Sequence, residues 1–296
     1  MYYDENSIMY LDGQWIKSSD AKIDLFSQTL HYGSGVFEGI RSYSSAAGPH
    51  VFKAKEHYER LLYSAKKMNI DFHRSVNELV NITYELLDKN KIENAYIRPL
   101  VYLGANMKLA STVETHFMIA AWEWAAYLGD KPLRVTVSSF QRPNPKAIPI
   151  DAKISGNYTN SILATNEAKR KGFDEALLLD SNGHVAEGPG ANFFFIKDDI
   201  IYTPPLGHIL PGITRATVIE YAMELGYPVV EKHFTVEEMR GADIAFFTGT
   251  AAEIACISSI DDIKFVDDWK ETIGYELFQM YRQRVTNSEF SDFTLV

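Results

Sequence analysis

Apolar and polar positions along the first part of the chain follow two different periods. Residues 53–70 and 75–91 place apolar side chains at spacings of three and four, which predicts two helices. Apolar and β-branched residues instead concentrate in short segments that predict strands: 8–16, 35–43, 95–104 and 116–124. Asp12-Gly13 interrupts the first of these segments and predicts a hairpin turn.

The second part of the chain repeats strands and helices with clear stop signals. Helices are predicted over 159–171 and 214–225, each followed by a glycine, Gly172 and Gly226, of the kind that ends a helix. Strands are predicted at 175–180, 184–188, 192–197 and 243–249. Together with the first part, this pattern predicts an α/β (α+β) protein.

A break in the pattern divides the chain. The segment 127–132, YLGDKP, contains a glycine and a proline that interrupt the preceding apolar run. We therefore predict a small α/β domain over 1–126, a linker over 127–132 and a larger domain over 133–296.

Composition narrows the classes of function. Apolar residues make up 46% and charged residues 23% of the 296 residues, as in ordinary globular proteins. The net charge of -10 argues against a nucleic-acid partner, which needs a basic surface. The single cysteine, Cys256, excludes an intrachain disulfide, and the run from Phe117 is too short to span a membrane. With no signal peptide in the pattern, we expect a cytoplasmic protein without membrane partners.

Common metal and nucleotide motifs are absent from the sequence. There is no H-E-x-x-H and no closely spaced histidine pair, so no metal site is predicted. The segment 183–190, GHVAEGPG, has Pro189-Gly190 where a P-loop needs Lys followed by Ser or Thr. A phosphate would therefore have to be bound by a structural element other than a P-loop.

Two loops could bind a phosphate through their backbone N–H groups. Gly212 precedes a helix that opens with Ile213 and Thr214, so free backbone N–H groups and the positive end of the helix dipole are available. A strand ends at Gly249, and Thr250 follows in a turn with further backbone donors. Each loop taken alone could need glycine only for its geometry. Together they favour one phosphate bound by backbone amides.

Lys153 and Glu187 carry the candidate chemistry. Lys153 lies between apolar neighbours, directly before a Ser-Gly-Asn turn and a helix that begins near Tyr158, where a solvated surface lysine is unusual. Pyridoxal enzymes hold their cofactor as a Schiff base on a lysine. Glu187 ends a strand beside glycines that include Gly190, so a planar ring could approach the backbone while the acid pairs with a ring nitrogen. The alternative for both residues is an ordinary exposed charge.

At these residues the sequence resembles the class IV, or fold-type IV, pyridoxal-phosphate enzymes, and in particular the branched-chain amino acid aminotransferases. The resemblance runs in order through HYGSGVFEGIRSY, EHYERLLYSA, AYIRPLVYLG, DAKISGNYTNS, EGPGANFF, LPGITR and TGTAAEI, which covers nearly the whole chain. It implies a two-domain fold like that of the D-amino acid aminotransferases, with pyridoxal 5'-phosphate at the domain interface.

The resemblance also implies roles for individual residues in cofactor binding. Lys153 would carry the cofactor, Glu187 would face the pyridine nitrogen, and Tyr158 would hydrogen-bond the phenolic oxygen of the ring. Arg60 would bind the phosphate beside the second-domain loops. The full implied cofactor set is Arg60, Lys153, Tyr158, Glu187, Gly212, Ile213, Thr214, Gly249 and Thr250.

For the substrate, the resemblance implies recognition of the α-carboxylate by Tyr96 and Arg98, helped by donors at Thr250 and Ala251. Arg41 would stabilise the distal carboxylate of glutamate, and Tyr32 would come from the partner subunit of a homodimer. The full implied substrate set is Tyr32, Phe37, Gly39, Arg41, Tyr96, Arg98, Trp124, Tyr127, Gly190, Thr250 and Ala251.

The predicted reaction is ping-pong transfer of the amino group of leucine, isoleucine or valine to 2-oxoglutarate. A D-amino acid aminotransferase or an aminodeoxychorismate lyase of the same fold remains an alternative at this point, as does a non-catalytic protein that only binds the cofactor. The D-amino acid aminotransferase should lack the combination of Tyr96-x-Arg98 with Thr250-Ala251-Ala252. The lyase would release pyruvate without an amino acceptor.

Overall fold

The computed structural model describes residues 5–109, 114–124, 131–265 and 268–286. The chain forms two compact units. The first unit comprises Met1–Ala125, Ala152–Gly156 and Val285–Val296, and the second comprises Ala126–Asp151 and Asn157–Arg284. The domain limits of 1–126 and 133–296 stay a prediction, and the units differ from them most clearly at Ala152–Gly156, which contains Lys153 and groups with the first unit.

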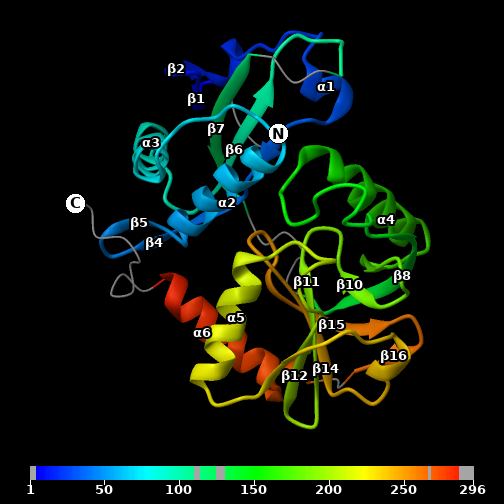
Figure 1. The fold of residues 1–296 in the computed structure, drawn as a ribbon. Coiled ribbons are helices and arrows are strands. Elements are labelled where there is room, and N and C mark those ends of the chain that lie inside the picture. The colour runs from blue at the N-terminus through cyan, green and yellow to red at the C-terminus, as the bar shows by residue number, and fades with distance from the viewer. Residues whose placement is uncertain (1–4, 110–113, 125–130, 266–267, 287–296) are drawn as a thin grey trace. The chain divides into compact units, whose positions relative to one another are not determined.

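The first unit is built on an antiparallel sheet in the order β2-β1-β7-β6-β4-β5, with β3 also paired to β6 (Figure 1). Its strands are β1 Ile8–Leu11, β2 Gln14–Lys17, β3 Val36–Phe37, β4 Ile40–Ser45, β5 Gly48–Val51, β6 Ala95–Leu103 and β7 Thr115–Trp122. The predicted hairpin at Asp12-Gly13 is confirmed, because both residues have positive φ and join β1 to β2.

One predicted strand, 35–43, is interrupted in the structure. It forms β3 and β4 with Glu38 and Gly39 between them, and the side chain of Glu38 is fully buried. A buried carboxylate requires charged or hydrogen-bonding partners, so this interruption marks a polar cluster inside the unit.

Helices α1 Gln28–Tyr32, α2 Ala54–Lys67 and α3 Val76–Asn90 belong to the first unit, together with the 3-10 turn η1 Ser18–Asp20. The two helices expected from the apolar spacing are confirmed as α2 and α3, which pack on each other and against the sheet (Figure 1). The side chain of Ser75 caps α3 by accepting a hydrogen bond from the amide of Glu78.

The second unit contains a mixed sheet in the order β10-β9-β8-β15-β14-β11-β12-β13, with β16 paired to β15. Since β10 also pairs with β11, the strands from β10 to β11 close into a ring. The strands are β8 Leu133–Gln141, β9 Glu175–Leu179, β10 Val185–Glu187, β11 Asn192–Lys197, β12 Ile200–Thr203, β13 Val229–Glu231, β14 Ile244–Gly249, β15 Glu253–Ile260 and β16 Ile263–Lys264.

The helical elements of the second unit are η2 Ser155–Asn157, α4 Tyr158–Arg170, α5 Ile213–Glu224, η3 Glu237–Met239, η4 Trp269–Glu271 and α6 Ile273–Thr286, of which η2 and α6 extend past its limits. Gly172 and Gly226 follow α4 and α5 with positive φ, as predicted for helix stops. Small residues of α4, Ala164 and Ala168, pack on β9 in a buried cluster. No helix among the described residues is long and apolar enough to cross a membrane.

Candidate functional site

Lys153 is anchored at its backbone by the first unit. Its amide donates a hydrogen bond to Ser64 Oγ on α2 (2.9 Å), and its carbonyl accepts one from the amide of Phe37 (3.1 Å). Ile154 forms a bridge with Val36, so the lysine segment runs beside β3. Lys153 Nζ lies 5.1 Å from the centre of the Phe37 ring, and the side chain is half-buried. The fold therefore fixes this amine at a defined place in the unit.

A buried charge cluster lies next to this segment. Glu38 pairs with Arg60 of α2 through both carboxylate oxygens, at 2.6 Å to Nε and 2.9 Å to Nη2. His57 Nδ1 is 2.8 Å from Glu38 Oε2. Burial by itself raises the pKa of Glu38, but Arg60 and the hydrogen bond to His57 outweigh it and hold that pKa far below its ordinary value. Burial keeps the pKa of His57 below its usual value, although Glu38 opposes this. Arg60 is thus held in a fixed plane by an ionised carboxylate.

Tyr96 and Arg98 lie side by side on β6, as their spacing of two predicts. Arg98 Nη2 donates a hydrogen bond to Tyr96 Oη (2.9 Å), and the guanidinium carbon lies 4.6 Å from the centre of the Phe37 ring. Arg98 Nε is buried and has no hydrogen-bond partner among the described residues. An arginine with an unused buried donor suits a carboxylate ligand.

The predicted aromatic and arginine groups around Tyr96 are also brought together. Tyr96 packs edge-on against Trp124, with 4.5 Å between ring centres, and Arg41 Nη2 donates to the Trp124 carbonyl (2.8 Å). A Cβ atom at Gly39 would lie 2.0 Å from Tyr96 Oη, so only glycine leaves room for this ring. The first unit therefore collects Lys153, the Tyr96–Arg98 pair and an aromatic lining.

Glu187 is the centre of a separate cluster in the second unit. Its side chain is buried, and Oε1 lies 2.8 Å from Arg142 Nε. Asn192 Nδ2 donates to Oε2 (2.9 Å), and the Leu210 amide lies 3.3 Å from both oxygens. These partners fix the carboxylate and balance its charge, so it can remain ionised in a buried place.

The two predicted phosphate loops lie at the ends of α5 and β14. Helix α5 has Gly212 at its N-cap, no side-chain cap and no acidic residue in its first turn. A Cβ atom at Gly212 would overlap Asn192 Oδ1 at 1.8 Å, so this loop runs directly over the Glu187 cluster. Gly249 ends β14, and Thr250 and Ala251 form the turn into β15. The first turn of α5 thus keeps backbone N–H groups without a side-chain cap, where an anion could be bound.

The remaining predicted residues take scattered positions. Tyr158 is the first residue of α4 and is half-buried, while Gly190 is exposed with open space around its α-carbon. Tyr32 is 47% exposed at the end of α1 and donates a hydrogen bond to the Met107 carbonyl. Tyr127 lies outside the described residues.

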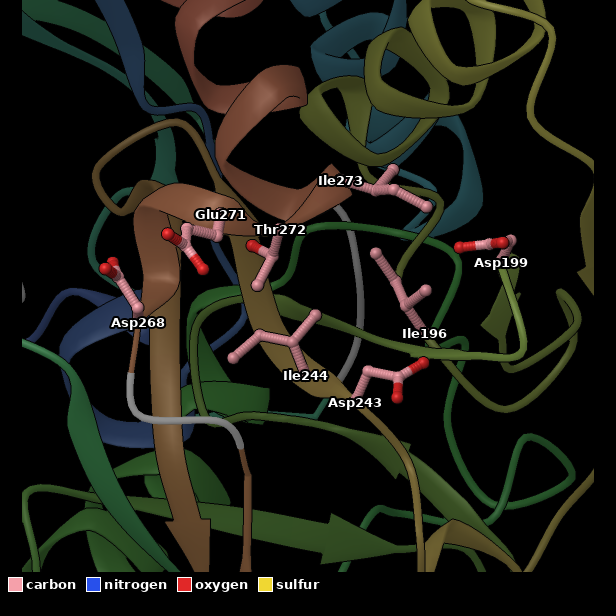
Figure 2. Close-up of a pocket in the computed structure, with 8 residues that line it drawn as sticks. All are labelled: Ile196, Asp199, Asp243, Ile244, Asp268, Glu271, Thr272 and Ile273. Carbon is pink, nitrogen blue, oxygen red and sulfur yellow. The ribbon is translucent and has the colours of Figure 1, made fainter.

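A pocket of the second unit is lined by residues other than the predicted ones (Figure 2). It has a volume of about 340 Å³. Figure 2 shows four carboxylates and three isoleucines around it, and none of the eight lining residues belongs to the predicted site. Its acidic lining is the wrong charge for a phosphate, so it does not compete with the α5 and β14 loops as a cofactor site.

Sequence reasoning missed the partners of the predicted charges. Glu38 and His57 hold Arg60, and Arg142 and Asn192 hold Glu187. Glu38 stands inside the GVFEGIRSY motif, where a charged residue within an apolar strand was the available signal. Arg142 carried no such signal, because it reaches Glu187 only through the tertiary fold.

Comparison with known proteins decides the family. The sequence matches the family described as "Amino-transferase class IV" over residues 35–260. The chain belongs to the class IV aminotransferases. The branched-chain-amino-acid aminotransferase of Pseudomonas aeruginosa is 43% identical over 267 residues, which is 88% of this chain and 87% of that protein.

Solved structures of the family agree closely with the fold. The branched-chain aminotransferase of Thermoproteus uzoniensis, crystallised with norvaline, has a TM-score of 0.91 at 38% identity and covers 96% of each chain. The branched-chain amino acid aminotransferase of Thermobaculum terrenum, in its PLP-containing holo-form, has a TM-score of 0.89 at 33% identity over 95% of each chain. The predicted fold class and family resemblance are therefore confirmed, and this class IV aminotransferase is an enzyme.

We expect Glu38→Gln to lower the free energy of unfolding by about 3 kcal/mol at neutral pH, because it removes one partner of a buried ion pair. The pKa of Glu38 is depressed in the folded state, so its contribution is complete above its ordinary pKa of 4.5 and is lost progressively as the pH falls from that value through the much lower pKa of the folded protein. Urea denaturation at pH 7 and at about pH 3 measures the difference.

The matched control is Glu59→Gln, also near Arg60 in sequence, whose exposed pair with Lys55 spans 3.9 Å. It should change stability by less than about 0.5 kcal/mol. A destabilisation by Glu38→Gln that is equally large at both pH values would contradict an ionised Glu38.

Proposed function

We propose that this protein is a branched-chain L-amino acid aminotransferase that uses pyridoxal 5'-phosphate and transfers the amino group of leucine, isoleucine or valine to 2-oxoglutarate in a ping-pong reaction. The observation that carries the proposal is Arg98, which is oriented by Tyr96 and Phe37 and keeps a buried donor for a carboxylate. The names of the relatives, branched-chain aminotransferases from several bacteria, support the same assignment.

The residues present fit the cofactor. In the second unit, the buried Glu187 would pair with the pyridine nitrogen, and Asn192 and Arg142 keep its oxygens in place. The amides at Gly212–Thr214 and at Gly249–Thr250 would hold the phosphate, where the uncapped first turn of α5 favours an anion. Tyr158 would hydrogen-bond the phenolic oxygen.

In the first unit, Lys153 would attach the cofactor through Nζ and afterwards carry the proton of the substrate α-carbon. Its backbone hydrogen bonds to Ser64 and Phe37 restrict where the amine can reach. Arg60, oriented by Glu38, would add a cation to the phosphate site. When bound, pyridoxal phosphate acts as an electron sink that makes the α-proton removable.

For the substrate, Arg98 and Tyr96 would bind the α-carboxylate, helped by the turn at Thr250 and Ala251. Phe37 and Trp124 would line the space for the apolar side chain of the substrate. Gly39, which has no side chain, leaves room for the Tyr96 ring beside Trp124. Arg41, whose guanidinium is held by the Trp124 carbonyl, would stabilise the distal carboxylate of 2-oxoglutarate. Gly190 and Tyr127 remain predicted lining residues.

We also propose a homodimer in which Tyr32 is contributed to the partner's site. Tyr32 lies in an exposed apolar patch with Leu25, Phe26, Leu30 and Met107. Hydrogen bonds join the segment 25–32 to the segment 106–107, and these two segments form the patch. A patch of this kind is typical of a surface covered by another chain. A cytoplasmic location stays a prediction.

A substrate panel tests the proposal against its alternatives. We expect glutamate to form from 2-oxoglutarate with L-leucine, L-isoleucine or L-valine, and not with D-alanine. The variant Lys153→Ala should lose at least about 10²-fold in kcat, because the proton-transfer group is removed. Preference for D-alanine would instead favour a D-amino acid aminotransferase, and release of pyruvate from aminodeoxychorismate without an acceptor would favour the lyase.

The substitution Tyr96→Phe tests the carboxylate site. It removes the acceptor that orients Arg98, so KM for L-leucine should rise about tenfold, the loss of one hydrogen bond to a charged group. Steady-state kinetics give KM, and cofactor fluorescence titration should show unchanged binding of pyridoxal phosphate. Tyr102→Phe on the same strand is the matched control and should leave both constants unchanged. Equal KM values for the two variants would refute the role of Tyr96.

A further inference from the structure

A group of metal-binding side chains lies in the second unit outside the aminotransferase residues. Asp180, His184 and His233 each place one ligand atom within 4.8 Å of the other two, and His208 lies beside them. We propose that Asp180, His184 and His233 form a binding site for a first-row divalent transition metal of the zinc class, with His208 as a neighbouring fourth ligand.

Distances within the group match metal ligands better than hydrogen bonds. Asp180 Oδ2 lies 3.6 Å from His184 Nδ1 and 3.8 Å from His208 Nδ1, both beyond hydrogen-bond range. Two ligands of a tetrahedral zinc ion, each about 2.0–2.2 Å from the metal, lie about 3.3–3.6 Å apart. The two measured separations lie within about 0.5 Å of this spacing, and the ligand atoms of Asp180, His184 and His233 all lie within 4.8 Å of one another.

Asp180 provides an independent observation that points to a cation at this place. Its side chain is 1% exposed, and Oδ2 has no hydrogen-bond partner among the described residues. The other oxygen, Oδ1, accepts bonds from the amides of Asn182 and His184 and so fixes the direction of the carboxylate. A buried carboxylate oxygen without a donor is costly unless a cation meets it.

The backbone holds the remaining ligands in register with Asp180. The amide of Asp180 donates to the carbonyl of His184, which closes the turn between β9 and β10. The Val185 amide donates a hydrogen bond to the Phe234 carbonyl (2.9 Å). His184 directly precedes Val185 and His233 directly precedes Phe234, so this bond brings the two histidines together. Their ring centres are 5.0 Å apart. The three ligands are therefore supplied by a turn and a segment that the fold already joins.

The donor set selects the kind of metal. Two or three imidazoles and one carboxylate suit zinc or nickel, whereas magnesium prefers oxygen ligands alone. The nearby Lys232 pairs with Glu238, so its positive charge is balanced locally. The histidines are too far apart in sequence to form a recognisable motif, which is why the sequence predicted no metal.

Calorimetric titration of the metal-stripped holoenzyme with Zn²⁺ tests the site. We expect one Zn²⁺ per chain, and a loss of affinity of at least about 10-fold in His184→Ala and in His233→Ala. Mg²⁺ should show no such binding. The exposed side chain of His233 makes that variant safe for folding, and its transaminase activity should equal that of the wild type.

His73→Ala is the matched control, because the His73 side chain is 89% exposed and pairs with Asp71 in the first unit. It should bind Zn²⁺ like the wild type. The proposal is overturned if no stoichiometric binding occurs, or if all three variants bind Zn²⁺ equally, which would place the metal elsewhere, for example on the cofactor phosphate. Zinc should also raise the melting temperature of the wild type and of His73→Ala, and at the same Zn²⁺ concentration it should raise that of His233→Ala less.

Discussion

The hydrogen bonds that hold the backbone of Lys153 are the constraint on which the rest of this structure depends. The amide and carbonyl of one residue are bound by Ser64 and Phe37, while the chain before and after the segment 152–156 belongs to the second unit. The amine of a long lysine side chain can reach many positions unless the backbone that carries it is fixed. By fixing it beside the Phe37 ring, which Arg98 also contacts, the fold brings the predicted attachment point and the predicted carboxylate site to one element.

Each unit buries a carboxylate and stabilises it with the same kinds of partner. Glu38 has Arg60 and His57, and Glu187 has Arg142, Asn192 and a backbone amide. Each acid has a guanidinium within 2.8 Å and a second, neutral partner, which together offset the cost of removing charge from water. In the first unit this arrangement orients the guanidinium of Arg60, and in the second unit it orients the carboxylate of Glu187. The same kind of ion pair therefore fixes a cation in one unit and an anion in the other.

Local signals in the sequence were sufficient for the helices, their glycine stops and the strand β10, which ends at Glu187. They failed where a side chain's role depends on distant partners. The charge of Glu38 inside an apolar strand marks it as unusual, but its partners Arg60 and His57 lie on another element, and Arg142 reaches Glu187 only through the tertiary fold. The grouping of Lys153 with the first unit also depends on the pairing of its neighbour Ile154 with Val36, a contact far away in sequence.

Chemical trapping of the cofactor tests the central claim most directly. The holoenzyme would be reduced with borohydride, digested and analysed by peptide mass spectrometry, with unreduced protein as the control. The account predicts the added mass of pyridoxyl phosphate on the peptide that contains Lys153, only after reduction. The same mass on any other lysine, or none on a protein that still binds the cofactor and transaminates L-leucine, would contradict it.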